Sequence, residues 1–167
     1  SVTDRFGVAQ PVIWVKASGF DLGTMGAEGF TALSLPALLA LAELESLSDA
    51  DMVTEVKRAR LDPQAAAASI EAIVHALVPF AFVDHSHADA VLTLSTSAGG
   101  TDRLREVFGP RVMVLPYVKP GFDLARQMRD VVRSPAFAGA EAIVLEHHGV
   151  FTWGQTARES YDRMIEI

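Results

Sequence analysis

Strand-like and helix-like segments alternate along the whole chain, and this alternation narrows the choice of fold more than any other property of the sequence. Apolar residues at every second position are typical of strands, and apolar residues three and four apart are typical of helices. We expect strands at 12–15, 31–35, 80–87 and 111–115, and two short strands bent at Gly149 within 141–153. Such a mixture predicts an α/β layered domain, although periodicity alone cannot order the strands.

Helices are expected between these strands, at 36–47, 49–60, 63–78, 88–96, 102–108, 120–132 and 157–167. Ser48 or Asp49 is suited to cap the second of them, and Thr101 can cap the helix that follows Gly99-Gly100. Pro63 suits the first turn of the third helix. The core stripe of that third helix would consist of Ile70, Ile73, Val74 and Leu77.

The composition is that of one globular domain over residues 1–167, because half of the residues are hydrophobic and 21% are charged. The net charge of −7 and the lack of any Lys or Arg block argue against nucleic acid or anionic lipid as a partner. The absence of cysteine excludes disulfide scaffolds and thiol catalysis.

No run approaches the ~18 apolar residues of a membrane span, and no signal peptide is visible, so we expect a cytoplasmic protein. The chain does not start with Met and stops inside an expected helix, so we expect a domain that is incomplete at both ends.

Four of the five histidines fall into two tight groups, at 83–88 and 145–149. Residues two apart on a strand point to the same face, so His85 and His87 project side by side. Two such imidazoles can reach one metal ion at roughly 2.0–2.1 Å. One further ligand would leave a coordination position open, which is typical of a catalytic zinc site rather than a structural one.

The second group can supply that third ligand. Neighbouring residues on a strand face opposite ways, so only one of His147 and His148 should serve. His147 shares a face with Ile143 and Leu145, which look like core residues, and His148 is therefore favoured. A lone His-x-His pair is more often a surface or hydrogen-bonded pair. The second group, in a chain otherwise poor in histidine, makes a metal the better interpretation.

Glu71 is the candidate general base, because a carboxylate beside an open zinc site can take the proton from a carbon next to a bound carbonyl. The alternative is a solvated helix residue paired with His75. Ser18-Gly19 closes a loop after a strand, and such loops offer N–H groups and a hydroxyl to an anion. Lys16 could add positive charge, and Ser69 lies just before Glu71.

Four segments, in this order, resemble the class II aldolase/adducin family. They are the Ser-Gly phosphate loop at 17–19, the catalytic Glu segment at 69–71, the His-x-His pair at 85–87, and the third-ligand motif at 148–154. The residues at 116–124 and 157–161 further resemble the aldolase half of the bifunctional rhamnulose-1-phosphate aldolase/alcohol dehydrogenase proteins. In those proteins a dehydrogenase domain follows. No Gly-rich dinucleotide fingerprint of that second half is found in this chain.

The resemblance implies a three-layer α/β/α sandwich with a mostly antiparallel central sheet, usually in a homotetramer. It implies retro-aldol cleavage of a phosphorylated ketose to dihydroxyacetone phosphate and a small aldehyde. The implied metal is zinc, or another divalent ion. The implied site consists of His85, His87 and His148 on the metal, Glu71 as acid/base, and Ser18, Gly19 and Ser69 near the phosphate.

The sequence departs from the family pattern at two places. Ile70 stands where the family has a second Ser, which removes one hydroxyl, and the upstream Gly-Asn loop is not found. Two rival functions stay open. One is a sugar-phosphate 4-epimerase of the same fold, and the other is a non-catalytic assembly module like an adducin head, which would be expected to lose ligand histidines.

Overall fold

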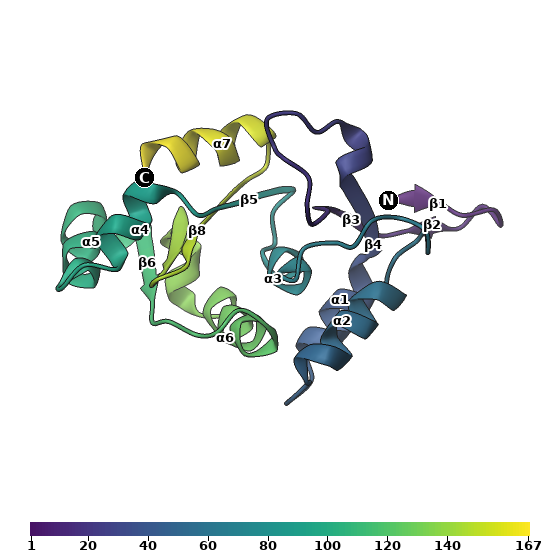
Figure 1. Ribbon diagram of the computed structural model, residues 1–167, viewed down its shortest axis with the longest axis horizontal. Helices are drawn as coiled ribbons and strands as arrows, with labels where there is room; N and C mark the ends of the chain where they lie inside the picture. Colours follow the sequence, from purple (N-terminus) through teal and green to yellow (C-terminus); the bar gives the residue numbers. More distant parts are fainter. The chain divides into compact units, whose positions relative to one another are not determined.

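The strands of the computed structural model, which describes residues 1–167, fall into three small sheets (Figure 1). Two are antiparallel pairs, β1 (Val2–Thr3) with β2 (Ala9–Gln10) and β3 (Val12–Lys16) with β4 (Phe30–Ser34). The third has the order β5-β8-β7-β6. The mixed α/β class is thereby confirmed, and the three-layer sandwich around one central sheet stays a prediction.

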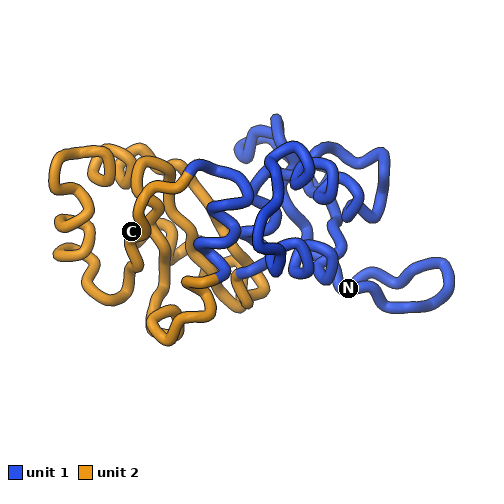
Figure 2. The backbone as a smooth tube through the Cα atoms, turned by 90° about the horizontal axis from the view of Figure 1, so that it is seen from below, with its two compact units in different colours: residues 1–77, 119–129 blue, residues 78–118, 130–167 orange.

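The chain divides into two compact units, coloured separately in Figure 2. The first unit contains residues 1–77 and 119–129, and the second contains residues 78–118 and 130–167. None of the helices combines the length and the apolar character needed to cross a membrane.

The first unit is built on the β3–β4 pair, in which Trp14 lies opposite Ala32. Its helices are α1 (Leu35–Ala42), α2 (Asp49–Arg58), α3 (Ala72–Leu77) and the first part of α6 (Phe122–Val132). Ser48 caps α2 as expected, because its hydroxyl accepts a hydrogen bond from the Asp51 N–H at 3.1 Å. Lys119 donates to the Asp49 carboxylate at 2.8 Å, and this bond lowers the pKa of that carboxyl below its ordinary value.

The prediction of a helix over 63–78 is wrong for its first half. Residues 59–69 run beside β4 and the end of β3 instead, with isolated bridges at Leu33–Arg60 and Ala17–Ala68. The buried Thr31 hydroxyl donates to the Ala66 carbonyl at 2.8 Å, which helps to fix this segment. Because these backbone groups pair across the sheet edge, the alanine-rich run cannot form a helix.

Only α3 keeps the predicted apolar stripe. Ile73, Val74 and Leu77 are buried, whereas Ile70 lies before the helix and is 44% exposed. Glu71 immediately precedes α3, and its carbonyl accepts the first bond of the helix from the His75 N–H at 3.0 Å.

The second unit contains the four-stranded sheet, in which β6 and β7 are parallel and the other neighbours are antiparallel. Its strands are β5 (Phe82–Ser86), β6 (Val112–Leu115), β7 (Ala142–Leu145) and β8 (Gly149–Gly154). Its helices are α4 (Asp89–Ser95), α5 (Gly100–Phe108), the end of α6, and α7 (Ala157–Glu166). Short 3-10 turns cover Ala27–Gly29 in the first unit, and Gly109–Arg111 and Pro135–Gly139 in the second.

The two faces of this sheet have different neighbours. Val144 and Val150 point to one face and form a buried cluster with Val91 of α4 and Leu104 of α5. On the other face Trp153 stacks on Phe137, with ring centroids 4.7 Å apart. Burial of this apolar surface on both faces stabilises β7 and β8, the strands that lead into and out of the second histidine group.

Candidate metal centre

The register of β5 against β8 places His85 opposite Phe151. The two rings stack, with centroids 4.0 Å apart and an interplanar angle of 12°. The His85 Nδ1 atom lies 3.0 Å from the carbonyl oxygen of Val150, a contact in which only the N–H form can donate. This bond fixes the tautomer in which Nε2 carries the lone pair, as the outer-shell partners of metal-binding histidines do.

Ser86, between the two histidines, faces the other way. Its hydroxyl donates to the Met164 sulfur of α7 at 3.1 Å. His85 and His87 therefore share the opposite side, as the period of the strand predicts. Their Nε2 atoms are 3.1 Å apart.

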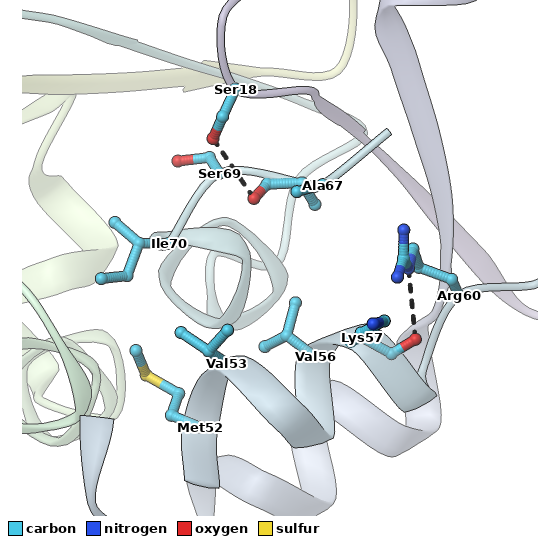
Figure 3. Close-up of a pocket in the computed structure, with 10 residues that line it drawn as sticks. Ser18, Met52, Val53, Val56, Lys57, Arg60, Ala67, Ser69 and Ile70 are labelled. Atoms are coloured by element: carbon cyan, nitrogen blue, oxygen red, sulfur yellow. Dashed lines mark hydrogen bonds between the residues drawn. The ribbon is translucent and has the colours of Figure 1, made fainter. Parts of the chain in front are cut away.

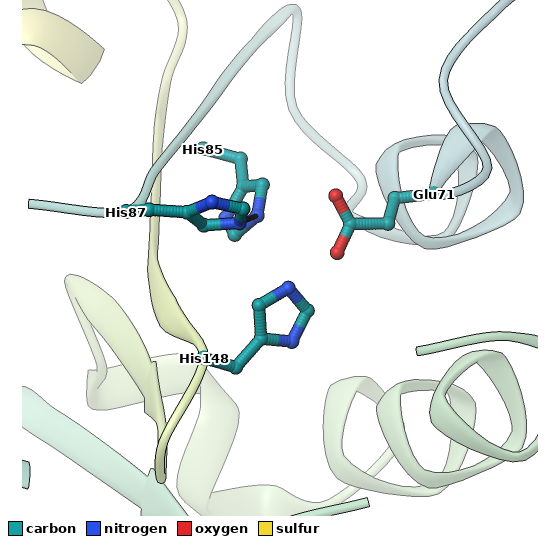
Figure 4. Close-up of side chains that lie close together, drawn as sticks. All are labelled: Glu71, His85, His87 and His148. Carbon is teal, nitrogen blue, oxygen red and sulfur yellow. Dashed lines mark hydrogen bonds between the residues drawn. The ribbon is translucent and has the colours of Figure 1, made fainter. Parts of the chain in front are cut away.

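His148 completes a group of three imidazole rings (Figure 4). Its ring centroid lies 5.2 Å from that of His85 and 5.1 Å from that of His87. The ligand atoms of the three histidines lie within 4.8 Å of one another. His85 and His148 are half-buried, and His87 is exposed, so the group is open to solvent on one side.

This donor set fits a divalent metal ion. Two nitrogens bound at 2.0–2.1 Å with a tetrahedral angle would be about 3.3 Å apart, close to the distance between the two Nε2 atoms. Neutral imidazoles suit zinc and other first-row transition metals. Three protein ligands leave room for an oxygen ligand in a fourth position.

His148, and not His147, lies beside the other two histidines, but the alternation of a strand is not the reason. Both residues lie in the turn between β7 and β8, not on a strand. His147 has a left-handed backbone with φ of 56°, and its ring lies against Tyr117, with centroids 6.0 Å apart. This single left-handed residue turns the two neighbouring rings in separate directions.

Gly149 allows the first two rings to approach β8 closely. A Cβ atom at this position would lie 2.9 Å from Cδ2 of His87, 3.1 Å from Cε1 of His85, and 2.4 Å from the Ser86 carbonyl oxygen. Contacts this short would displace β5 or the rings. Glycine is therefore required here for space, and not for an unusual backbone angle.

The turn that carries His148 is tied to its surroundings on both sides. The Glu146 N–H donates to the Leu115 carbonyl at the end of β6, at 3.0 Å. The Glu146 carboxylate accepts a hydrogen bond from the Thr101 hydroxyl in the first turn of α5. The prediction that Thr101 caps the helix is wrong, because Gly99 holds the cap position. Thr101 instead holds the turn.

The other expected site residues belong to the first unit. Glu71 is 8% exposed, and its N–H donates to the Ser69 hydroxyl at 3.2 Å. The Ser69 N–H in turn donates to the Lys16 carbonyl at 3.1 Å. The Lys16 ammonium donates to the Ala17 carbonyl at 3.3 Å.

The Ser18-Gly19 loop differs in one respect from the expected anion loop. The Ser18 N–H is not available to an anion, because it donates to the Ala67 carbonyl at 2.8 Å. The Ser18 hydroxyl is exposed and lies 3.5 Å from the Ala68 carbonyl oxygen. Gly19 has a left-handed φ of 86°, which explains a glycine at the tip of the loop.

Sequence reasoning did not identify the supporting residues of the centre. Gly149 was recognisable as a bend and as part of the motif at 148–154, but not for the space it leaves to the rings, and Thr101 was recognisable only as a cap. The proximity of Gly149 to the His-x-His pair depends on the register of two strands more than sixty residues apart, which no local pattern contains.

Comparison with known proteins gives one family over residues 1–167, described as the Class II Aldolase and Adducin N-terminal domain. A protein of Bacillus subtilis (strain 168) named uncharacterized oxidoreductase YuxG is 35% identical over 156 residues, which make up 93% of this chain and 22% of that protein. The chain thus spans about a fifth of the length of this curated relative.

Two solved structures have similar folds. The N-terminal class II aldolase domain of a conserved protein from Thermoplasma acidophilum is 37% identical, with a TM-score of 0.91 over 99% of this chain and 76% of that one. An aldolase II superfamily protein from Pseudomonas syringae is 12% identical, with a TM-score of 0.61 over 91% of this chain and 56% of that one. At that identity, the second likeness concerns the fold alone.

Proposed function

Because the chain belongs to the class II aldolase and adducin family, we propose that it is a metal-dependent lyase that cleaves a phosphorylated ketose by a retro-aldol reaction. The substrate is of the rhamnulose-1-phosphate type, and the products are dihydroxyacetone phosphate and a small aldehyde. Zinc is the expected metal, and another divalent ion could take its place.

One observation carries the proposal. Three imidazoles, from β5, from the residue that follows it and from the β7–β8 turn, have nitrogens close enough to share one ion. An assembly module without chemistry would have no need of this arrangement. A divalent ion at His85, His87 and His148 would polarise the substrate carbonyl and stabilise the negative charge left when the carbon–carbon bond breaks.

Glu71 is the proposed acid/base. Cleavage releases the proton of the hydroxyl that becomes the aldehyde carbonyl, and one proton is added to the carbon that keeps the electron pair, so no net proton is consumed. In this direction the Glu71 carboxylic acid gives the proton to that carbon. In the reverse direction its carboxylate takes that proton back. Its burial supports the role, because it restricts the side chain to few orientations.

The phosphate of the substrate is proposed to bind near Ser18, Gly19 and Ser69, with Lys16 contributing charge. The two hydroxyls are brought together by the pairing of residues 67–69 with the end of β3. Hydroxyls of this kind donate to phosphate oxygens.

Two further proposals concern the larger assembly. We expect a homo-oligomer, a tetramer by analogy with the family, and a dehydrogenase domain in the full-length polypeptide. The relative YuxG is named an oxidoreductase and is much longer than this chain, which is consistent with the second proposal.

The test of the function is release of aldehyde from rhamnulose 1-phosphate, with and without a chelator. We expect aldehyde release that stops on chelation and returns with zinc. Cleavage that survives complete removal of metal would refute the mechanism. Interconversion of sugar phosphates without release of aldehyde would favour the 4-epimerase instead.

Glu71→Gln tests the proposed acid/base. The variant should keep its metal and lose about 10²–10⁴-fold in turnover, because the amide cannot exchange the proton. Metal content and turnover are measured on the same preparation. Unchanged turnover would remove Glu71 from this role.

A further inference from the structure

A pocket of about 240 Å³ lies within the first unit, between α2 and the segment before α3 (Figure 3). Its apolar wall includes Val53 and Val56 of α2 together with Ile70. The hydroxyl residues Ser18 and Ser69 also line it. The pocket therefore includes two of the residues proposed to bind the substrate phosphate.

Two cations line the same pocket, Lys57 in the last turn of α2 and Arg60 just beyond it. Neither has an acidic side chain within 4 Å. The contrast with Arg58 is informative, because that neighbour forms an ion pair with Glu55. In a chain with a net charge of −7, two cations without acidic partners beside one pocket indicate a place for an anion.

Arg60 is held in place by the backbone. Its Nε donates to the Lys57 carbonyl at 3.3 Å, and its Nη1 donates to the Ala65 carbonyl. A guanidinium has five N–H donors, so several remain for a ligand. Lys57 is exposed, and its flexible side chain can move toward a charged group in the pocket.

We infer that Lys57 and Arg60 form, with Ser18 and Ser69, a binding subsite for an anion of the phosphate class. The inference rests on the proposed function, because the anion is the phosphorylated end of the substrate. The two cations supply the attraction that is lost where Ile70 replaces a hydroxyl residue. The two cations at the end of α2 thus compensate for the weaker phosphate binding by the hydroxyl loop.

Binding of inorganic phosphate to the full chain tests the inference. Calorimetric titration is made on the protein with its metal and after chelation, so that phosphate bound directly to the metal is recognised. Lys57→Gln should weaken phosphate binding about tenfold in both states, because a charge-assisted contact is lost. Arg60→Lys keeps the charge but loses the planar donors, and should weaken binding about threefold.

Arg58→Gln is the matched control, because it removes the same charge from the same turn without lining this pocket. It should change phosphate affinity by less than about twofold. An equal loss of phosphate affinity in Lys57→Gln and Arg58→Gln would mean that only the general positive charge of this region attracts phosphate, and it would overturn the inference. Unchanged phosphate affinity in Lys57→Gln would overturn it as well.

Failure of the inference and failure of the proposed function give different results. Phosphate binding that depends on Lys57 but persists after chelation supports the subsite, even if no ketose is cleaved. Metal-dependent cleavage with the same KM in Lys57→Gln and in the unaltered protein would keep the lyase and reject the subsite.

Discussion

The histidine centre of the second unit and the hydroxyl loop of the first unit are held in different ways. His85 stands on β5, which is paired along its length with β8, and it is fixed further by Val150 and Phe151. His87 directly follows this strand. Ser18 and Ser69 stand outside regular strands and depend on a few bonds between residues 67–69 and the end of β3. The comparison predicts a rigid metal site and a more adaptable anion site.

This difference corresponds to what each group is proposed to bind. A metal ion requires ligand atoms within a few tenths of an ångström of fixed distances, and sites on strands meet that requirement. A phosphate can be bound by charge and by rotating hydroxyls, so loops and flexible cations suffice. Variants in one unit should therefore change one of the two affinities and leave the other unaltered.

The largest effect is expected from Gly149→Ala. The added methyl group would collide with the rings of His85 and His87, and we expect metal affinity to fall more than about a hundredfold, beyond the range of losses seen for outer-shell changes. Metal affinity is measured by competition with a chromophoric chelator. Phosphate affinity should stay the same.

Gly139→Ala is the control for this substitution, because a Cβ atom there meets nothing within 4 Å. It should leave metal affinity unaltered. If Gly149→Ala binds metal as tightly as this control, the close approach of β8 to the rings is not a requirement of the site.

Thr101→Val should have a smaller effect on the same centre. Loss of the hydroxyl removes the bond to Glu146 and loosens the turn that carries His148, so metal affinity should fall about tenfold. Thr101→Ser keeps the hydroxyl and should restore the affinity. A loss of the same size in both variants would show that the methyl group, and not the hydrogen bond, matters.

Thr31→Val is the corresponding change in the first unit, and its effect should be the smallest. It removes the bond to the Ala66 carbonyl and should cost about 1 kcal/mol of unfolding free energy. Urea denaturation gives this free energy, and titration gives the two affinities. Weaker phosphate binding with unaltered metal binding is expected, and the reverse pattern would contradict the comparison.

Much of the second unit was predictable from the sequence because its signals are local. Short runs of apolar and β-branched residues predict β5, β6, β7 and β8, and the period of two places His85 beside His87. Gly109 ends α5 as the sequence indicates. The position of each strand in the sheet was not predictable, because it depends on pairing between distant segments.

The first unit was harder to predict around residues 63–71. Four successive alanines favour a helix, but the Ala67 carbonyl accepts a hydrogen bond from the Ser18 N–H, and the Ala66 carbonyl accepts one from the Thr31 hydroxyl. Tertiary pairing here overrides the local preference. The same segment carries Ser69 and leads to Glu71, so the local geometry of these residues could not follow from periodicity.

The central claim is that three histidines bind one divalent ion, and elemental analysis of purified protein tests it most directly. We predict about one metal ion per chain, lost in His85→Ala. His147→Asn is the control, because asparagine tolerates the left-handed backbone of that position, and it should keep its metal. Full metal content in His85→Ala would contradict the account.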